Sequence, residues 1–154
     1  IAFVSNNPDD ERIIESAKIA CAYDFINRLP NGLDTVVGEN GKGLSEGQIQ
    51  RIAIARAVYC NSPIIIFDEA TSNIDVESEE LIMNVIHELA KTKTVLLISH
   101  RLANVVKSDK IYFLKDGEIR ESGKHDELMS QNGAYRHLYE SQMALENYGK
   151  GGMA

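Results

Sequence analysis

The chain has 154 residues, a formal net charge of −7 and 44% hydrophobic residues, which is typical of one globular domain. The acidic balance and the lack of a Lys/Arg cluster argue against a nucleic-acid partner, because phosphate binding depends mainly on clustered Lys and Arg. The longest apolar runs, at 64–67 and 95–98, are too short to cross a bilayer, and no signal-peptide pattern is present. Any membrane link is therefore expected to come from another chain or segment. Cys21 and Cys60 have no metal-ligand spacing and are expected to be thiols.

The N-terminal part of the chain is expected to be mainly helical. The apolar segment Ile1–Val4 predicts a strand with no preceding chain, so the N-terminus is expected to be a cut end. Apolar residues recur at helical spacing over 10–29, which predicts one helix that ends at the PNG sequence of 30–32. A short extended segment over 35–40 then runs into GENGKG, and a second helix is predicted over 45–59.

Strands and helices alternate in the rest of the chain. The run 64–67 is apolar at every position, which predicts a parallel strand covered on both faces. Asp75 is the expected N-cap of the next helix, and Asp116-Gly117 is typical of a two-residue hairpin turn. The further predicted elements are a helix over 76–90, a strand over 94–99, hairpin strands over 111–114 and 118–121, and helices over 125–130 and 134–145. This alternation predicts an α/β layer with at least two parallel strands.

The segment Ser45-Glu46-Gly47-Gln48 opens the predicted helix over 45–59. One interpretation is a capping box, in which Ser45 caps the helix and Gln48 reaches back to it. The other is a phosphate site, because a helix N-terminus exposes unpaired N–H groups at the positive end of the dipole. In that case Gly47 would allow the phosphate to approach the backbone closely. The two interpretations are compatible, and these four residues do not decide between them.

A carboxylate pair, Asp68-Glu69, directly follows the apolar strand. Two carboxylates facing solvent at a loop would be the ordinary interpretation. Small residues follow the pair, however, and the next predicted strand ends in Ser99-His100. A metal-binding Asp beside a carboxylate that polarises water is the arrangement that nucleotide hydrolysis needs. His100 is a candidate site residue only because it follows that second strand, where it could contact the γ-phosphate.

These motifs together resemble the nucleotide-binding domain of an ATP-binding cassette (ABC) transporter. GLSEGQ resembles the family's signature motif, usually LSGGQ, and IIIFD resembles the Walker B strand. Glu69 resembles the catalytic glutamate, SNID the D-loop and His100 the switch histidine. The C-terminal sequence KDGEIRESGKHDELMSQNGAYRHLYESQ resembles the exporter branch, in which a membrane domain precedes the cassette on one polypeptide. The resemblance covers nearly the whole chain from Asn7.

The resemblance implies an α/β fold: a partial, P-loop NTPase-like ABC cassette. Such a cassette would have parallel-sheet core strands with helices, a helical signature subdomain, and a C-terminal β-hairpin and helices. The chain would be one partial domain over 1–154. Its helical and signature region would lie at about 7–60, its Walker B, D-loop, H-loop and C-terminal regions at 61–146, and a disordered tail at 147–154.

The resemblance also implies the roles of individual residues. Glu69 and His100 would be catalytic and Asp68 would hold Mg²⁺. ATP would be contacted by the signature and D-loop residues Ser45, Glu46, Gly47, Gln48 and Asp75. The implied partners are a second cassette, in a homodimer or heterodimer, and a transmembrane domain, but no nucleic acid. The paired cassettes would bind and hydrolyse ATP at the cytoplasmic face of a membrane to power export of an unknown substrate.

The sequence departs from the family pattern at three places. It contains no GxxxxGK[ST] loop, which would hold the β- and γ-phosphates and Mg²⁺. Asn6 stands where the Q-loop glutamine is expected, and a segment between Ser5 and Asn7 is expected to have dropped out. That segment would normally help contact the coupling helices of the membrane domain. Glu46 replaces the usual first glycine of the signature.

Two alternatives to a transport ATPase remain. The chain by itself would be a non-catalytic C-terminal fragment that pairs with another cassette, since it is expected to be inactive alone. A DNA-repair or chromosome-condensation ATPase has related motifs, but it would carry long coiled-coil segments between them, and none is visible. The acidic composition of this chain also argues against a DNA-repair or chromosome-condensation ATPase.

Overall fold

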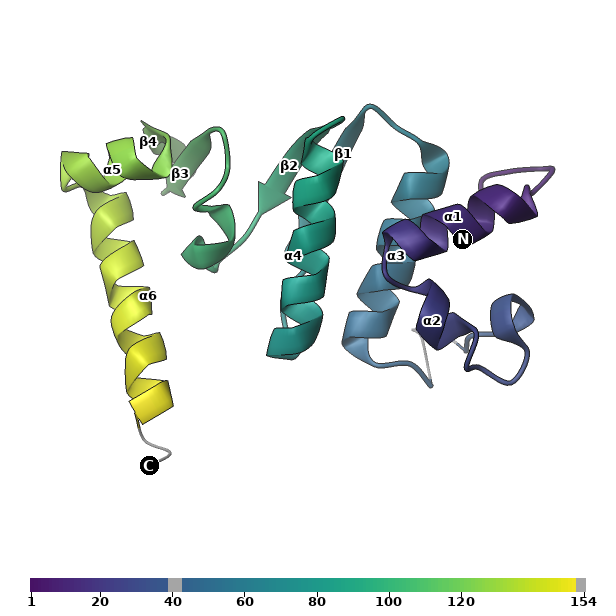
Figure 1. Cartoon of the computed structure of the whole chain (residues 1–154). Coiled ribbons are helices and arrows are strands. Elements are labelled where there is room, and N and C mark those ends of the chain that lie inside the picture. The colour runs from purple at the N-terminus through teal and green to yellow at the C-terminus, as the bar shows by residue number, and fades with distance from the viewer. Residues whose placement is uncertain (39–42, 152–154) are drawn as a thin grey trace. The chain divides into compact units, whose positions relative to one another are not determined.

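The backbone of residues 1–38 and 43–151 is described by a computed structural model, shown in Figure 1. The chain divides into two units, Ile1–Ile98 and Ser99–Ala154. In the first unit the elements are α1 (Asp10–Ile19), α2 (Tyr23–Ile26), η1 (Gly32–Asp34), α3 (Glu46–Cys60), β1 (Ile64–Asp68), α4 (Val76–Ala90) and β2 (Thr94–Ile98). In the second they are η3 (Leu102–Val105), β3 (Ile111–Lys115), β4 (Glu118–Gly123), α5 (His125–Gln131) and α6 (Ala134–Gly151).

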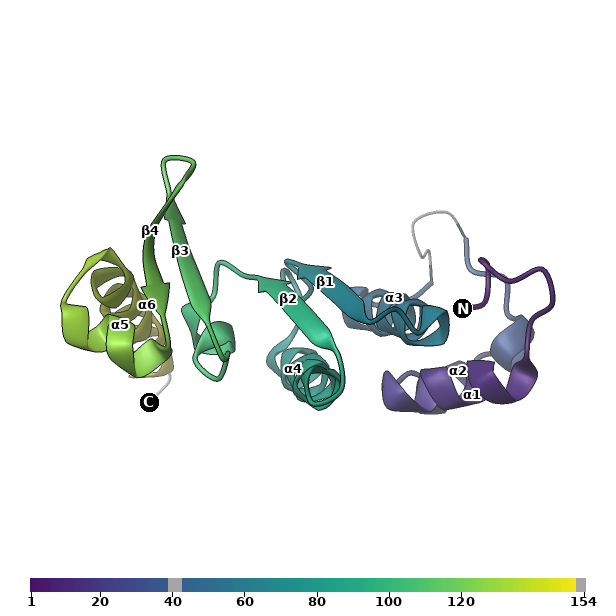
Figure 2. The ribbon, with the colours of Figure 1, turned by 90° about the horizontal axis from the view of Figure 1, so that it is seen from above.

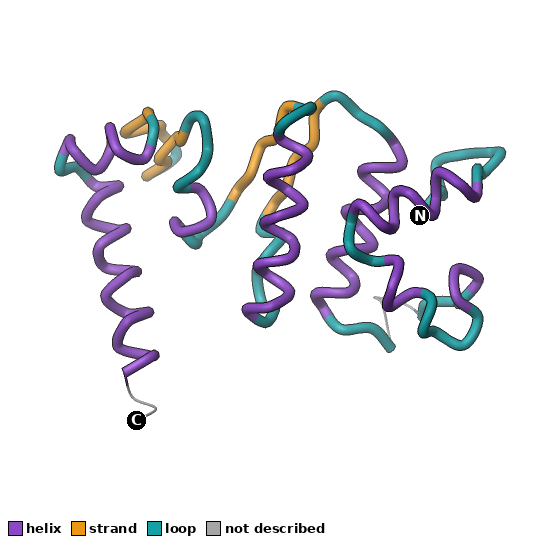
Figure 3. The backbone as a smooth tube through the Cα atoms, viewed as in Figure 1, coloured by secondary structure: helices purple, strands orange, loops and turns teal. Residues whose placement is uncertain are grey.

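Two helices, α1 and α2, stand where the sequence predicted one helix over 10–29, as Figure 3 shows. Between them Cys21 has a φ of +52°, and the N–H of Ala22 donates to the carbonyl of Ala17 at 2.7 Å. This left-handed turn ends α1 and buries both alanines fully. The prediction of a single helix was wrong because a regular spacing of apolar residues gives no sign of a left-handed residue such as Cys21.

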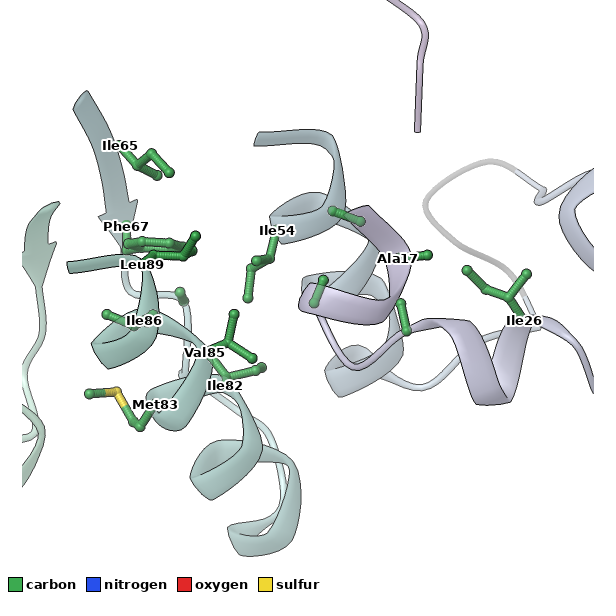
Figure 4. Close-up of a cluster of buried hydrophobic side chains, with 14 residues drawn as sticks. Ala17, Ile26, Ile54, Ile65, Phe67, Ile82, Met83, Val85, Ile86 and Leu89 are labelled. Atoms are coloured by element: carbon green, nitrogen blue, oxygen red, sulfur yellow. The ribbon is translucent and has the colours of Figure 1, made fainter. Parts of the chain in front are cut away.

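Helices α3 and α4 begin at the caps that the sequence predicted. Ser45 caps α3, and Asp75 caps α4 through a 2.8 Å bond that its Oδ1 accepts from the N–H of Ser78. The two helices share one hydrophobic core with β1, in which Ile54, Phe67 and Val85 are all buried, as Figure 4 shows. This shared core holds α3 and α4 in the same unit.

Strands β1 and β2 form a parallel pair, as predicted, with Ile64 opposite Thr94 and Asp68 opposite Ile98. Helix α4 lies along one face of this pair (Figure 2) and packs against β2. Residues alternate across the strand, so Ile65 is buried while Ile66 is 61% exposed. The prediction of a strand covered on both faces was wrong, because within the described residues helices pack on one face only.

The second unit contains the predicted hairpin, β3–β4, with Asp116 and Gly117 both at positive φ in its turn. Its inner face packs against α5 and α6, and Tyr135 of α6 is fully buried beside Phe113, with the two rings edge to face. The carboxylate of Glu121 accepts bonds from the N–H groups of Ala134 and Tyr135, at 2.6 and 3.3 Å. This carboxylate on β4 fixes the start of α6.

Both ends of the chain differ from the prediction. Residues 1–4 form no strand; the N–H of Ser5 donates to the carbonyl of Ala2 in a turn, and no strand in the described residues pairs with this segment. Helix α6 continues to Gly151, beyond the predicted end at 145 and into the expected disordered tail over 147–154. Of the extended segment over 35–40, residues 35–38 have no regular structure, and 39–40, with most of GENGKG, lie outside the described residues. No helix in the described ranges is long and apolar enough to span a bilayer.

Candidate nucleotide site

The carboxylate pair lies at the carboxyl end of β1. Asp68 is the last residue of the strand, and Glu69 follows it. Both side chains are exposed. The N–H of Glu69 donates to the carbonyl of Ile98 at 3.0 Å, so the end of β1 is tied to the end of β2.

The backbone of Glu69 has a φ of +50°. A non-glycine residue in this left-handed region is uncommon and persists where neighbouring contacts hold it. Here the carbonyl of Glu69 accepts two bonds from Ser72, one from its N–H and one from its hydroxyl, both at 2.9 Å. The backbone of Glu69 is thus fixed on both sides, at the N–H and at the carbonyl. Strain held in this way is common at functional sites, and sequence analysis did not anticipate it.

The D-loop residues end in the cap of α4. Asn73 also has a positive φ, +57°, which asparagine tolerates well. The hydrogen bond from the backbone N–H of Ser78 is the main reason that the pKa of Asp75 lies below its ordinary value. The Ser78 hydroxyl and the positive charge of Arg51 lower this pKa further. Asp75 is therefore ionised at neutral pH and partly committed to capping.

The start of α3 is a complete capping box. The N–H of Gln48 donates to Ser45 Oγ at 3.2 Å, and Gln48 Oε1 accepts from the N–H of Ser45 at 3.0 Å. This confirms the capping interpretation. Within the described residues, the N–H groups of Glu46 and Gly47 have no acceptor, as expected for the first turn of a helix. The side chain of Glu46 is exposed.

Gly47 is buried against the first turn of α4. A Cβ on Gly47 would lie 2.6 Å from Ser78 Oγ, 2.7 Å from Ser78 Cβ and 3.9 Å from Asp75 Oδ2. The glycine is therefore required for the close approach of two helix starts, a packing reason that sequence analysis did not identify. Contact between Gly47 and a phosphate stays a prediction.

Arg51 is a residue whose connections the sequence did not reveal. Its Nε–H donates to the carbonyl of Gly47 at 3.2 Å and its Nη1–H to the carbonyl of Cys21 at 3.0 Å. Its guanidinium also lies 5.0 Å from the ring centroid of Phe25. One side chain thus joins the α1–α2 turn to the first turn of α3. The only sequence signal was an arginine four residues after Gly47.

His100 belongs to the second unit and is exposed. Its carbonyl accepts a 2.7 Å hydrogen bond from Nε2 of Gln142, on α6. The structure therefore brings the signature start and Asp75 together in the first unit, and places Asp68 and Glu69 at the end of β1 in the same unit. His100 lies in the second unit, and its contacts are described within that unit.

The residues present fit a magnesium nucleotide in part. Exposed carboxylates at a strand end supply the oxygen ligands that Mg²⁺ prefers. The two N–H groups at the start of α3 that have no acceptor in the described ranges suit a phosphate. In the described part of the chain, however, no three or more His, Cys, Asp or Glu side chains form a group that could hold a metal. Asp68 would thus be one ligand in a shell completed by the nucleotide, water or residues outside the described ranges.

Known proteins of one family resemble this chain in sequence and in fold. The profile of the family described as ABC transporter matches residues 3–72. The ATP-dependent lipid A-core flippase of Haemophilus influenzae (strain 86-028NP) is 53% identical over 134 residues, which are 87% of this chain and 23% of that protein. The flippase of the same name from Pectobacterium atrosepticum is 52% identical over 143 residues, which are 92% of this chain and 25% of that protein.

Among solved structures, a bacterial Atm1-family ABC exporter with ATP bound superposes with a TM-score of 0.84 at 39% identity. The match covers 92% of this chain and 25% of that one. The chain thus spans about a quarter of the length of the relatives it matches. On sequence and on fold together, the chain belongs to the ABC transporter family, as part of an exporter-type nucleotide-binding domain.

Proposed function

We propose that this chain supplies the signature motif and the hydrolytic carboxylates of an ABC ATPase that powers export of a lipid. The observation that carries the proposal is the fixed backbone of Glu69 beside Asp68. Three hydrogen bonds hold Glu69 at an uncommon φ. Its N–H donates to the carbonyl of Ile98, and its carbonyl accepts from both the N–H and the hydroxyl of Ser72. Such a position suits a side chain that must meet a reacting water in a defined direction.

The two carboxylates have different roles in this proposal. Bound Mg²⁺ would neutralise charge on the phosphates and hold them for in-line attack. Asp68 would contribute an oxygen ligand to that ion. Glu69 accepts a hydrogen bond from the attacking water and polarises it, as a general base does. The proposed role of His100 is contact with the γ-phosphate of a bound nucleotide.

In this proposal two cassettes pair, and the start of α3 contacts the nucleotide that the partner cassette holds. The N–H groups of Glu46 and Gly47, which have no acceptor among the residues that the structure describes, lie at the positive end of the helix dipole, which favours a phosphate. The Ser45 hydroxyl oxygen accepts from Gln48, and no described residue accepts its proton, so the hydroxyl can also donate to a phosphate. Gln48 holds Ser45 in place through the capping box. Asp75 lies next to this surface, where it caps α4.

The lipid substrate is proposed from the relatives, two of which are named lipid A-core flippases. We propose that the cassette works as a pair, with a second cassette and a transmembrane domain, at the cytoplasmic face of a membrane. The acidic composition of the chain, with a net charge of −7, favours these partners over a nucleic acid.

The test is ATP hydrolysis by the full-length transporter in liposomes with and without lipid A-core. We expect Mg²⁺-dependent hydrolysis that lipid A-core stimulates more than a phospholipid of matched acyl chains does. Hydrolysis without selective stimulation would overturn the substrate class alone. Absence of Mg²⁺-dependent hydrolysis in a correctly folded, ATP-binding preparation would overturn the assignment as an ATPase.

A further inference from the structure

Gln142, on α6, holds the segment that carries His100 by both ends of its side-chain amide. Its Nε2 donates to the carbonyl of His100 at 2.7 Å, and its Oε1 accepts from the N–H of Leu102 at 2.9 Å. The two bonded positions lie on either side of Arg101, so a single planar group spans this short stretch of backbone. All of these residues belong to the second unit.

The segment has a second, local restraint. Ser99 Oγ accepts from the N–H of Arg101 at 3.0 Å and donates to the carbonyl of Arg101 at 3.1 Å. Leu102 is buried as the first residue of η3, and η3 packs against α6. The N–H of Leu102 is one of the groups at a helix start that needs an acceptor from elsewhere. Gln142 supplies that acceptor from a position 40 residues away in sequence.

Glutamine suits this role because its amide offers one acceptor and two donors in one plane. A carboxylate of the same shape could accept from Leu102 but could not donate to His100, and its charge would face a carbonyl oxygen. An alanine would leave both backbone groups without this partner. The geometry therefore assigns a function to the side chain that helix formation alone does not require.

We infer that Gln142 is a positioning residue for His100: it fixes the backbone from which this histidine is presented to the γ-phosphate. The inference rests on the proposed function, in which His100 takes part in hydrolysis. Its amide is bonded to the backbone at His100 and at Leu102, so Gln142 acts through the backbone of residues 100–102. Loss of its amide should therefore affect turnover more than ATP affinity.

The first test is hydrogen–deuterium exchange on the full-length transporter. Gln142→Ala should increase exchange in the peptide that covers residues 100–105, and Gln142→Glu should do so less, because it keeps the acceptor for Leu102. Gln131→Ala removes the same kind of amide from an exposed position at the end of α5 and is the matched control. Unchanged exchange in this peptide for Gln142→Ala would overturn the inference.

The second test is a double-mutant cycle on kcat for ATP hydrolysis. Gln142→Ala should lower kcat by about tenfold, with the KM for ATP changed less than about twofold, since one or two net hydrogen bonds are lost. Combined with His100→Ala, it should cause no further drop. A full additional drop would show that Gln142 acts independently of His100 and would overturn the inference. Normal hydrolysis by His100→Ala would instead refute the role of His100, and the inference with it.

Discussion

Gly47 and Ser78 are packed so closely that a Cβ on Gly47 would lie 2.6 Å from the Ser78 hydroxyl oxygen. This contact joins the first turn of the signature helix α3 to the first turn of α4. Because Asp75 caps α4 at the same place, the geometry of the signature start depends on the D-loop cap.

Gly47→Ala should lower the free energy of unfolding by about 1–3 kcal/mol, the usual cost of an overpacked position. Ser78→Gly removes the atoms that would clash, so it should recover part of this loss when the two changes are combined. Urea unfolding of both single variants and the double variant measures the coupling. Strictly additive effects would show that the two residues do not meet as described.

Asp75 should make stability depend on pH at the acidic end. Hydrogen bonds from Ser78 lower the pKa of its carboxyl below the ordinary 3.8. The ionised Asp75 cap therefore stabilises the folded protein fully above the ordinary pKa. This stabilisation is lost as the pH falls through the lower pKa of the folded state. Between pH 6 and pH 3, Asp75→Asn should lose less stability than the parent does, as measured by thermal unfolding. Asp109→Asn, which removes one charge elsewhere, is the control, and equal slopes for Asp75→Asn and the parent would contradict the prediction.

Glu69→Gln in the full-length protein should nearly abolish ATP hydrolysis while ATP binding persists, because a neutral amide polarises water poorly. ATP should then trap the cassettes as a pair, which size-exclusion chromatography detects. Asp68→Asn should instead weaken the Mg²⁺ dependence of ATP binding, because a ligand charge is lost. Near-normal turnover by Glu69→Gln would remove the basis for the catalytic assignment.

Glu46→Gly should leave hydrolysis intact and change ATP-driven pairing only modestly. An acidic residue in the first turn of a helix is favoured by the dipole by about 0.3–1 kcal/mol. A charge that faced a phosphate at ~6 Å would cost roughly 2–3 kcal/mol at an effective dielectric near ~20. The exposed position of the Glu46 side chain allows it to face solvent or a basic residue of the partner. Collapse of activity in this variant would indicate a direct role for Glu46.

The 154-residue chain by itself should bind ATP weakly and show no steady hydrolysis. It contains no GxxxxGK[ST] loop, and this loop supplies most of the donors that grip a triphosphate. Isothermal titration calorimetry against Mg-ATP checks this directly. Micromolar affinity would mean that another segment of the chain takes over the role of the loop.

Local chemistry determined the elements that were predicted correctly. The bounds of α4, Val76–Ala90, agree with the prediction because a capping aspartate and a helical apolar pattern both act within a few residues. The hairpin around Asp116-Gly117 agrees for a similar reason, since its turn needs two residues at positive φ. The predictions that failed depended on packing partners: a strand at 1–4 needs a neighbouring strand, and the unbroken helix ignored the turn at Cys21.

The candidate site divides in the same way. The capping box of Ser45 and Gln48 and the placement of Asp68 and Glu69 after a strand could be predicted from adjacent residues. The contacts of Arg51 with Cys21 and of Gln142 with His100 and Leu102 join residues 30 or more apart in sequence. No periodicity or motif in the sequence encodes such contacts, because they depend on how the helices pack against one another within each unit.

The outer face of the β1–β2 pair has a practical consequence for anyone who purifies this polypeptide. Branched apolar side chains at alternate positions line this face, with exposures from 44% to 61% for Ile64, Ile66, Leu96 and Ile98. Adjacent apolar side chains promote self-association on a short sheet whose edges pair with no other strand in the described part of the chain. Light scattering of the isolated polypeptide should therefore rise steeply with concentration, and a lysine in place of Ile66 should suppress this rise without disturbing the inward-facing Ile65 and Phe67.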